Sequence, residues 1–335
     1  MGDPGRRGHL ARWRPLLTAL VLSAAFAYLG VALASDWHSL RQHRWSIHWG
    51  RWALSLVLAG GWFALRGLLW QSLLRSFGHP LHFREAFRMW ALSELGRYLP
   101  GSVWYALGRG HLAAEKGIGA AVTFTCMALE LSLVLLGAAL ISIAGFGAAS
   151  DSGRPLLVAA PVLLVLALAL VQPRVLRAVF RSTGRTVPER LPGVRKLLGT
   201  LLLSGVLWLV MGLSFAVFAS SLVPLPWSRW PAAGSAYAAS WAIGFLAIVS
   251  PGGLGVRESV LTALLRPLMP AGSAVVVALG SRVWLTVAEA LGALLALWIG
   301  RTSARETESK TVTTHLVATG AGGGAGGERP GSVGW

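Results

Sequence analysis

Residues 250–259, with the sequence SPGGLGVRES, place a helix-breaking Pro-Gly-Gly and two opposite charges between two strongly apolar stretches. In the interior of a membrane, irregular backbone is tolerated only where it is buried in protein or lines a cavity, because lipid cannot satisfy its hydrogen bonds. An ionisable side chain at that depth is costly and usually marks a functional site. The segment therefore argues against a simple bundle of unbroken spans, and it makes Arg257 and Glu258 the first candidates for a site.

The overall composition indicates that the rules for membrane proteins apply to this chain. The sequence is 54% hydrophobic and 13% charged, with a mean hydropathy of +0.61, and these values are unlike those of a soluble domain. We expect an all-α polytopic integral membrane protein, in which residues 15–300 form about seven or eight transmembrane helices of roughly 20 residues each. The net charge of +17 lies mainly in loops, so it predicts membrane orientation and not nucleic-acid binding. The single cysteine lies in an apolar run, so we predict neither a disulfide, nor a metal site, nor a cofactor.

The orientation follows from the basic segments. Residues 1–14 are rich in arginine and precede an apolar run at residues 15–34. This run is longer than the roughly 7 to 15 residues of a signal-peptide core, which favours an uncleaved first span over a cleaved signal. We expect a protein of the plasma membrane, and the positive-inside rule predicts that its N-terminus lies on the cytoplasmic side. The basic stretch at residues 172–199 likewise predicts a cytoplasmic loop.

A second break falls at Pro100-Gly101, between two apolar stretches that are each too short to span a membrane. Proline disfavours the helical conformation of the residue before it, so one short helix should end near Leu99 and another should begin after it. We predict a re-entrant pair over residues 78–117, and a surface amphipathic helix broken by a loop is the alternative. The charged residues nearest the break are Glu94, Arg97 and Arg109.

Further charges lie inside the long apolar segments. Glu130 is at least two turns from either end of its segment, and we expect it to be protonated or paired with an arginine across the bundle. Arg282 and Glu289 are seven residues apart, which places them close to one helix face. Arg66 lies near the middle of another span, where it either extends toward the interface or faces the bundle.

The two halves of the chain resemble each other weakly, because each has a Pro-Gly break followed by an arginine and then by a span with buried charges. Paired broken segments of this kind point to a binding site at corresponding positions. The N-terminus of a short helix next to an arginine favours a phosphate or a carboxylate. We expect Arg257 to receive this anion and Glu258 to be its counter-charge. Structural ion pairs that only lock the bundle, Arg257 with Glu258 and Arg282 with Glu289, are the alternative.

The motifs RYLPGSVWYALGR at 97–109 and SPGGLGVRES at 250–259 resemble the flippase-like family related to the transmembrane region of lysylphosphatidylglycerol synthases. The resemblance covers roughly residues 15–300 and implies movement of a lipid, or of a lipid-linked headgroup, between leaflets. Full-length synthases of that family carry a soluble aminoacyl-transferase domain after the membrane region. Here residues 301–335 follow, which we predict to be a flexible glycine-rich tail, so no enzymatic activity is expected of this chain.

These observations predict a polar intramembrane cavity for the phosphate headgroup of a phospholipid or of a polyprenyl-phosphate-linked lipid. In this hypothesis Arg109, Arg257 and Arg282 attract the phosphate in turn, while Glu130 and Glu289 keep the empty cavity neutral or carry a coupling proton. Two alternatives stay open: a non-transporting scaffold or regulator of a lipid-modifying glycosyltransferase or synthase, and a small-solute or ion transporter. The candidate site comprises Glu94, Arg97, Pro100, Gly101, Arg109, Glu130, Pro251, Gly252, Gly253, Gly255, Arg257, Glu258, Arg282 and Glu289.

Overall fold

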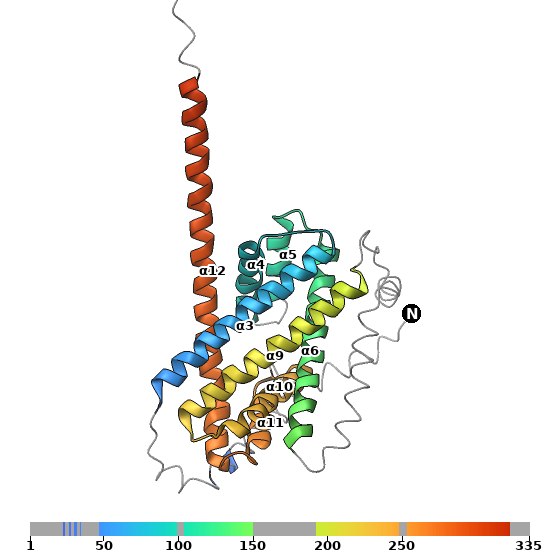
Figure 1. Cartoon of the computed structure of the whole chain (residues 1–335), viewed down its shortest axis with the longest axis vertical. Coiled ribbons are helices and arrows are strands. Elements are labelled where there is room, and N and C mark those ends of the chain that lie inside the picture. Colours follow the sequence, from blue (N-terminus) through green and yellow to red (C-terminus); the bar gives the residue numbers. More distant parts are fainter. Residues whose placement is uncertain are drawn as a thin grey trace, which may run out of the picture.

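The structure is a computed structural model that describes residues 47–98, 104–149, 192–247 and 253–321, with the backbone alone for 146–149 and 300–321. Every regular element in these ranges is helical, which confirms the predicted all-α fold (Figure 1). The predicted span at residues 155–171 lies outside the described residues. Of the predicted span at residues 15–34, five positions are described, and these are helical.

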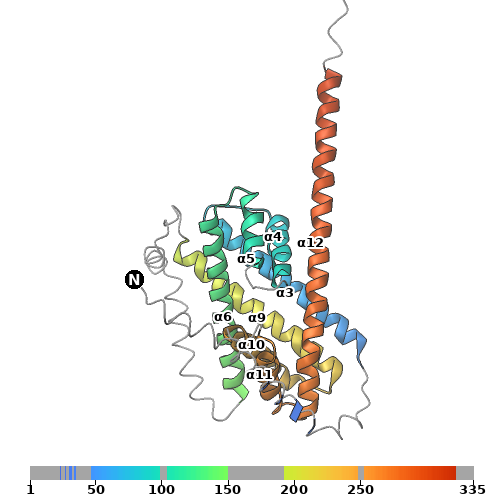
Figure 2. The ribbon, with the colours of Figure 1, turned by 180° about the vertical axis from the view of Figure 1, so that it is seen from behind.

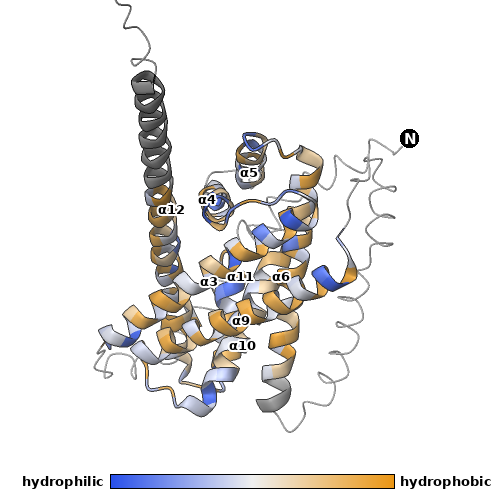
Figure 3. Ribbon diagram, turned by 45° about the horizontal axis from the view of Figure 1, so that its top comes forward, coloured by the Kyte–Doolittle hydropathy of each residue, from blue (hydrophilic) through white to orange (hydrophobic). Residues whose placement is uncertain are grey.

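Four of the described helices are long and apolar enough to cross a membrane, which confirms a polytopic membrane protein. Hydrophobic residues predominate along two of them, α6 and α9, as Figure 3 shows. The four are α3 (Trp49–Ser76), α6 (Ala120–Ala149), α9 (Val194–Leu222) and α12 (Ala271–Ala321).

The described helices form two units with the same order of lengths: a long helix, two short helices and a second long helix. In the first unit the short helices are α4 (Phe83–Glu94), extended by the one-turn helix η1 (Leu95–Tyr98), and α5 (Trp104–Ala114). In the second unit they are α10 (Trp230–Leu246), preceded by η2 (Trp227–Arg229), and α11 (Val256–Leu265). Each predicted Pro-Gly break falls between the two short helices of its unit. The break residues Pro100, Gly101, Pro251 and Gly252 themselves lie outside the described residues.

The two units are inverted relative to each other. Helices α3 and α9 lie side by side and run in opposite directions (Figures 1 and 2). Two contacts fix this direction: the His48 N–H donates to the Ser221 carbonyl at 3.0 Å, and the Ser214 hydroxyl donates to the Ser55 carbonyl at 2.7 Å. Helices α6 and α12 also run in opposite directions (Figure 1). The long helices of the second unit therefore run opposite to the corresponding helices of the first.

The contacts between the units agree with this opposite orientation. Helix α10 of the second unit packs on α6 of the first, and α4 of the first unit packs on α12 of the second. Within the second unit, small residues allow α9 and α10 to approach closely, since a Cβ atom on Gly234 would lie 2.8 Å from the Cα of Gly212. The Trp208 Nε1–H donates to the Val134 carbonyl at 2.7 Å, which gives a buried polar group a partner that lipid could not provide.

Two helix boundaries differ from the prediction. Helix α9 begins at Val194, so Arg195 and Lys196 belong to its first turn and not to the predicted loop. Helix α12 continues to Ala321, so the prediction of a flexible tail from residue 301 is wrong for residues 301–321 (Figure 1). Residues 301–319 contain no glycine and no proline, so nothing in this stretch stops a helix that is already formed.

Candidate functional site

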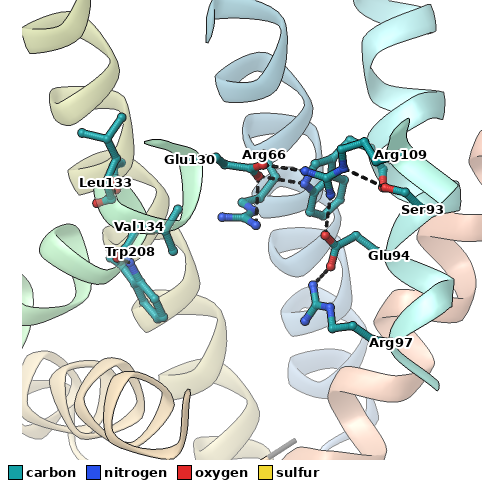
Figure 4. A network of polar contacts seen from close by, with 11 residues as sticks. Arg66, Ser93, Glu94, Arg97, Arg109, Glu130, Leu133, Val134 and Trp208 are labelled. Carbon is teal, nitrogen blue, oxygen red and sulfur yellow. Dashed lines mark hydrogen bonds and ion pairs between the residues drawn. The ribbon is translucent and has the colours of Figure 1, made fainter. Parts of the chain in front are cut away.

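Glu130 is the centre of a network that joins four helices of the first unit (Figure 4). This carboxylate, on α6, is 3% exposed. It accepts hydrogen bonds from Arg109 Nη1 of α5 at 2.6 Å and from Trp90 Nε1 of α4 at 2.9 Å. It also pairs with Arg66 Nη2 of α3 at 3.0 Å. Of the two states expected for this mid-span carboxylate, protonation or pairing with an arginine across the bundle, the structure has the pairing, with two arginines as partners.

Arg109 is fully engaged by protein groups. It is 1% exposed, and besides Glu130 it donates through Nη2 to Glu94 at 2.6 Å and through Nε to the Ser93 hydroxyl at 2.8 Å. Its guanidinium also lies 4.8 Å from the centroid of the Trp70 ring. A phosphate can contact Arg109 only if one of these bonds opens, so in the conformation observed here Arg109 fastens α4, α5 and α6 together.

Two more arginines complete the network. Arg97 of η1 pairs with Glu94, and its side chain is 46% exposed, so it forms the outer edge of the network. Arg66 lies inside the bundle between the rings of Trp62 and Trp90, at 5.5 and 5.2 Å from their centroids. Arg66 was not among the predicted site residues. Its partner Glu130 is 64 positions away in the sequence, so no local pattern shows that Arg66 faces inward.

In the second unit, the chain enters α11 through two glycines with positive φ, Gly253 at +68° and Gly255 at +76°. A Cβ atom on Gly253 would lie 2.6 Å from the carbonyl oxygen of Gly244, so this segment packs directly on the backbone of α10. The Gly255 N–H donates to a carboxylate oxygen of Glu258 at 2.7 Å, which caps the N-terminus of α11. These two predicted site glycines therefore set the backbone path at the break.

The ion pair of the second unit differs from the predicted one. Glu258 is 4% exposed and pairs with Arg282 of α12, so the predicted pairing of Glu258 with Arg257 is wrong. Neighbouring residues on a helix do not face each other, and this geometry turns Arg257 away from Glu258. In both units, therefore, an ion pair joins the second short helix to the long helix that follows it. The pair is Arg109 with Glu130 in the first unit and Glu258 with Arg282 in the second.

Arg257 is a buried cation without a carboxylate partner among the described residues. It is 7% exposed, and its guanidinium lies 4.8 Å from the centroid of the Tyr237 ring of α10. Its Nε and Nη2 atoms are buried and have no hydrogen-bond partner within the described part of the chain. A Cβ atom on Gly244 would lie 2.9 Å from the Arg257 Cβ, so α10 leaves this side chain little freedom to move. A desolvated cation of this kind is costly unless an anion joins it.

Glu289 connects the two units. Together with Glu94 it lines a small cavity between α4 and α12, with Phe63 and Trp90 among the apolar walls. The cavity measures about 10 Å³, which is room for about one water molecule. Glu289 also lies within electrostatic range of Arg97 in the first unit and of Tyr237 in the second. The two predicted carboxylates are thus brought together across the interface between the units.

Long apolar helices, two units of opposite orientation and buried ion pairs beside the breaks define a polytopic α-helical membrane protein. The chain belongs to the family described as the lysylphosphatidylglycerol synthase TM region, whose family model matches residues 16–300. This match confirms the resemblance that the two break motifs indicated, and it gives the chain a lipid-related membrane role. No curated protein matches the chain.

Proposed function

We propose that the chain moves an anionic lipid, or a lipid-linked headgroup, between the leaflets of the plasma membrane, with its N-terminus in the cytoplasm. The lipid-related family supports a lipid as the substrate. The inverted units with broken short helices support a transport mechanism, because this architecture gives secondary transporters their alternating access. Substrates of such proteins bind near the breaks, where the positive ends of half-helices point at anionic groups.

The observation that carries the proposal is the state of Arg257. It lies in the first turn of α11, directly after the break, and it is buried without a carboxylate partner among the described residues. Arg109, the corresponding arginine of the first unit, already contacts Glu94 and Glu130. An anionic headgroup could therefore bind Arg257 at the second break without displacing a carboxylate. At the first break it would have to displace Glu94 or Glu130 from Arg109.

The test is lipid movement in reconstituted liposomes. Fluorescent phospholipids with anionic headgroups are placed in one leaflet, and their appearance in the other leaflet is followed with the purified protein. We expect Arg257→Ala to slow this movement at least about tenfold, since an uncompensated contact between a charged group and its partner contributes roughly 2 to 5 kcal/mol. Arg257→Lys should retain part of the rate, because lysine keeps the charge and loses the planar fork.

The matched control is Arg266→Ala. Arg266 lies at the opposite end of α11 and is exposed, so its replacement removes a positive charge from the same short helix without touching the break. A wild-type rate for a folded Arg257→Ala variant would remove this residue from the mechanism. If the purified wild-type protein moves no lipid and copurifies with a lipid-modifying transferase, the scaffold alternative replaces the proposal.

A further inference from the structure

Tyr237 lies at the centre of the second unit, with its ring packed against two neighbouring helices. It belongs to α10 and is 0% exposed. The ring stacks on Phe215 of α9, with 4.5 Å between the ring centroids, and it meets the ring of Trp284 of α12 edge-on at 6.1 Å. A phenylalanine would make the same ring contacts. Packing therefore explains the aromatic ring at this position and leaves the hydroxyl group unexplained.

The Tyr237 hydroxyl is buried and has no hydrogen-bond partner within the described part of the chain. Such a group is rare in folded proteins, because it loses its hydrogen bonds to water without replacing them. The guanidinium group of Arg257 lies over the ring, 4.8 Å from its centroid. Arg257 cannot accept the hydroxyl proton, since a guanidinium group has five donors and no acceptor. The hydroxyl proton therefore still needs an acceptor.

The charged groups of α12 do not provide this acceptor. Glu289 and Arg282 both lie within electrostatic range of Tyr237, and neither forms a hydrogen bond with its hydroxyl. Arg282 is paired with Glu258, and Glu289 lines the small cavity between α4 and α12. In the conformation observed here, the hydroxyl thus has no acceptor from any of the charged side chains around it in the described residues.

Arg257 lacks acceptors in the same way. Nε and Nη2 form one edge of its guanidinium group, and both are buried without a hydrogen-bond partner among the described residues. This edge can donate two parallel hydrogen bonds to two oxygens of one anionic group. Together with the Tyr237 hydroxyl, the two side chains provide three donors and one positive charge. An oxyanion fits this set, because it brings a negative charge and oxygens that only accept hydrogen bonds.

We propose, resting on the transport function proposed above, that Tyr237 is a second binding residue of the Arg257 site and that its hydroxyl donates a hydrogen bond to the oxyanion that Arg257 binds. The hydroxyl adds a third donor, from α10, to the two donors that Arg257 provides from α11. A phosphate group, whether on a lipid headgroup or free in solution, has enough acceptor oxygens for all three bonds. Without the oxyanion, the unsatisfied hydroxyl destabilises the protein. Removal of the hydroxyl should therefore have opposite effects on stability and on binding.

The test is the variant Tyr237→Phe, which keeps the ring and removes only the hydroxyl. Thermal unfolding of delipidated protein in detergent without added phosphate is followed by tryptophan fluorescence. The Tm of Tyr237→Phe should equal that of wild type or be up to about 6 °C higher, because an unsatisfied buried group is lost. A clear drop in Tm would mean that the hydroxyl has a structural partner, and it would overturn the proposal. Tyr105→Phe is the matched control, since it removes the hydroxyl of a partly buried tyrosine from α5 of the first unit.

The second readout is the binding of two probes, inorganic phosphate and short-chain phosphatidic acid, with the Kd obtained from their effect on the Tm. For a probe that binds, Tyr237→Phe and Arg257→Ala should each raise the Kd at least about tenfold, and Tyr105→Phe should leave it unchanged. Binding of inorganic phosphate assigns the contact to the phosphate group itself, and binding of phosphatidic acid alone assigns it to a lipid headgroup; either result supports the proposal. A wild-type Kd for the folded Tyr237→Phe variant, or no binding of either probe, would overturn the role of Tyr237. The proposed function is judged separately, because it fails only if the wild-type protein moves no lipid in liposomes.

Discussion

Replacing Glu130 by glutamine removes the negative charge on which the first unit is assembled, with almost no change of shape. In the wild-type protein, the carboxylate receives bonds from two arginines and one tryptophan, on three different helices. Glutamine keeps one acceptor oxygen and places an NH₂ group against the other donors. Arg66 would lose the one carboxylate to which it is paired in the described residues, and Arg109 would keep only Glu94.

The magnitude follows from the burial of these groups. Arg66 is 7% exposed and Arg109 is 1% exposed, so water cannot replace the lost charge. Breaking a buried ion pair by removing one partner costs about 3 to 5 kcal/mol. The lower end applies here, because Glu94 still neutralises Arg109 and the Trp62 and Trp90 rings still face Arg66. With about 2 to 4 °C of Tm per kcal/mol, we expect Glu130→Gln to lower the Tm by roughly 6 to 12 °C.

The assay can use the single cysteine of the chain as a reporter. Cys126 lies one turn before Glu130 on α6 and is fully buried, at 0% exposure. A fluorogenic maleimide in detergent solution reacts with this thiol only when α6 separates from its neighbours. The temperature at which fluorescence rises therefore reports the opening of the network, and no introduced cysteine is needed.

Two further variants separate the electrostatic explanation from other causes. Glu115→Gln changes an exposed glutamate that pairs with His111, and its Tm should stay within about 2 °C of wild type. Replacing Arg66 by methionine in the Glu130→Gln background removes the unpaired cation and should recover part of the lost stability. A Tm drop of less than about 2 °C for Glu130→Gln, or no recovery in the double variant, would refute the account of Glu130 as the centre of the network.

The remaining predictions concern the second break and the surface. Gly244→Ala should reduce lipid movement and lower the stability of the fold by about 1 to 3 kcal/mol, because the new methyl group would overlap Arg257. The control Gly205→Ala has open space around the new methyl group, so in the same maleimide assay it should be neutral or slightly stabilising. The hydrogen bond from Lys116 holds the pKa of Glu85 below its usual range, so this pair stabilises the fold above about pH 4 and its contribution is lost as the pH falls through the lowered pKa. Glu85→Gln should therefore destabilise the protein by no more than about 1 kcal/mol at neutral pH and not at all at about pH 2, as measured by denaturation at both pH values.

The sequence was most informative where a local pattern determines local structure. Proline and glycine act on their own neighbours, so the Pro100-Gly101 pair predicted the division of residues 78–117 into two short helices. The helix extension at residues 301–321 was missed, because its polar composition resembles that of a flexible tail, although residues 301–319 contain no glycine or proline that would end a helix.

The partners of the buried charges could not be predicted in the same way. Arg66 and Glu130 meet because α3 and α6 cross at their positions, and the sequence contains no measure of that crossing. The pairing of Glu258 with Arg282 likewise depends on the packing of α11 against α12. The sequence alone could, however, have excluded an ion pair between Arg257 and Glu258. Side chains of adjacent residues on a helix point in different directions, so they do not face each other.

The opposite orientation of α3 and α9 has a consequence for the direction of transport. The two pairs of short helices, α4 with α5 and α10 with α11, lie toward opposite ends of the bundle, so the arrangement of helices alone gives lipid movement no preferred sense (Figure 1). The two breaks nevertheless differ in the state of their arginines, because Arg109 is paired with Glu94 and Glu130 whereas Arg257 has no carboxylate partner among the described residues. Under the proposed function, an anionic headgroup therefore meets unequal sites at the two breaks, a paired arginine at the first and an unpaired one at the second.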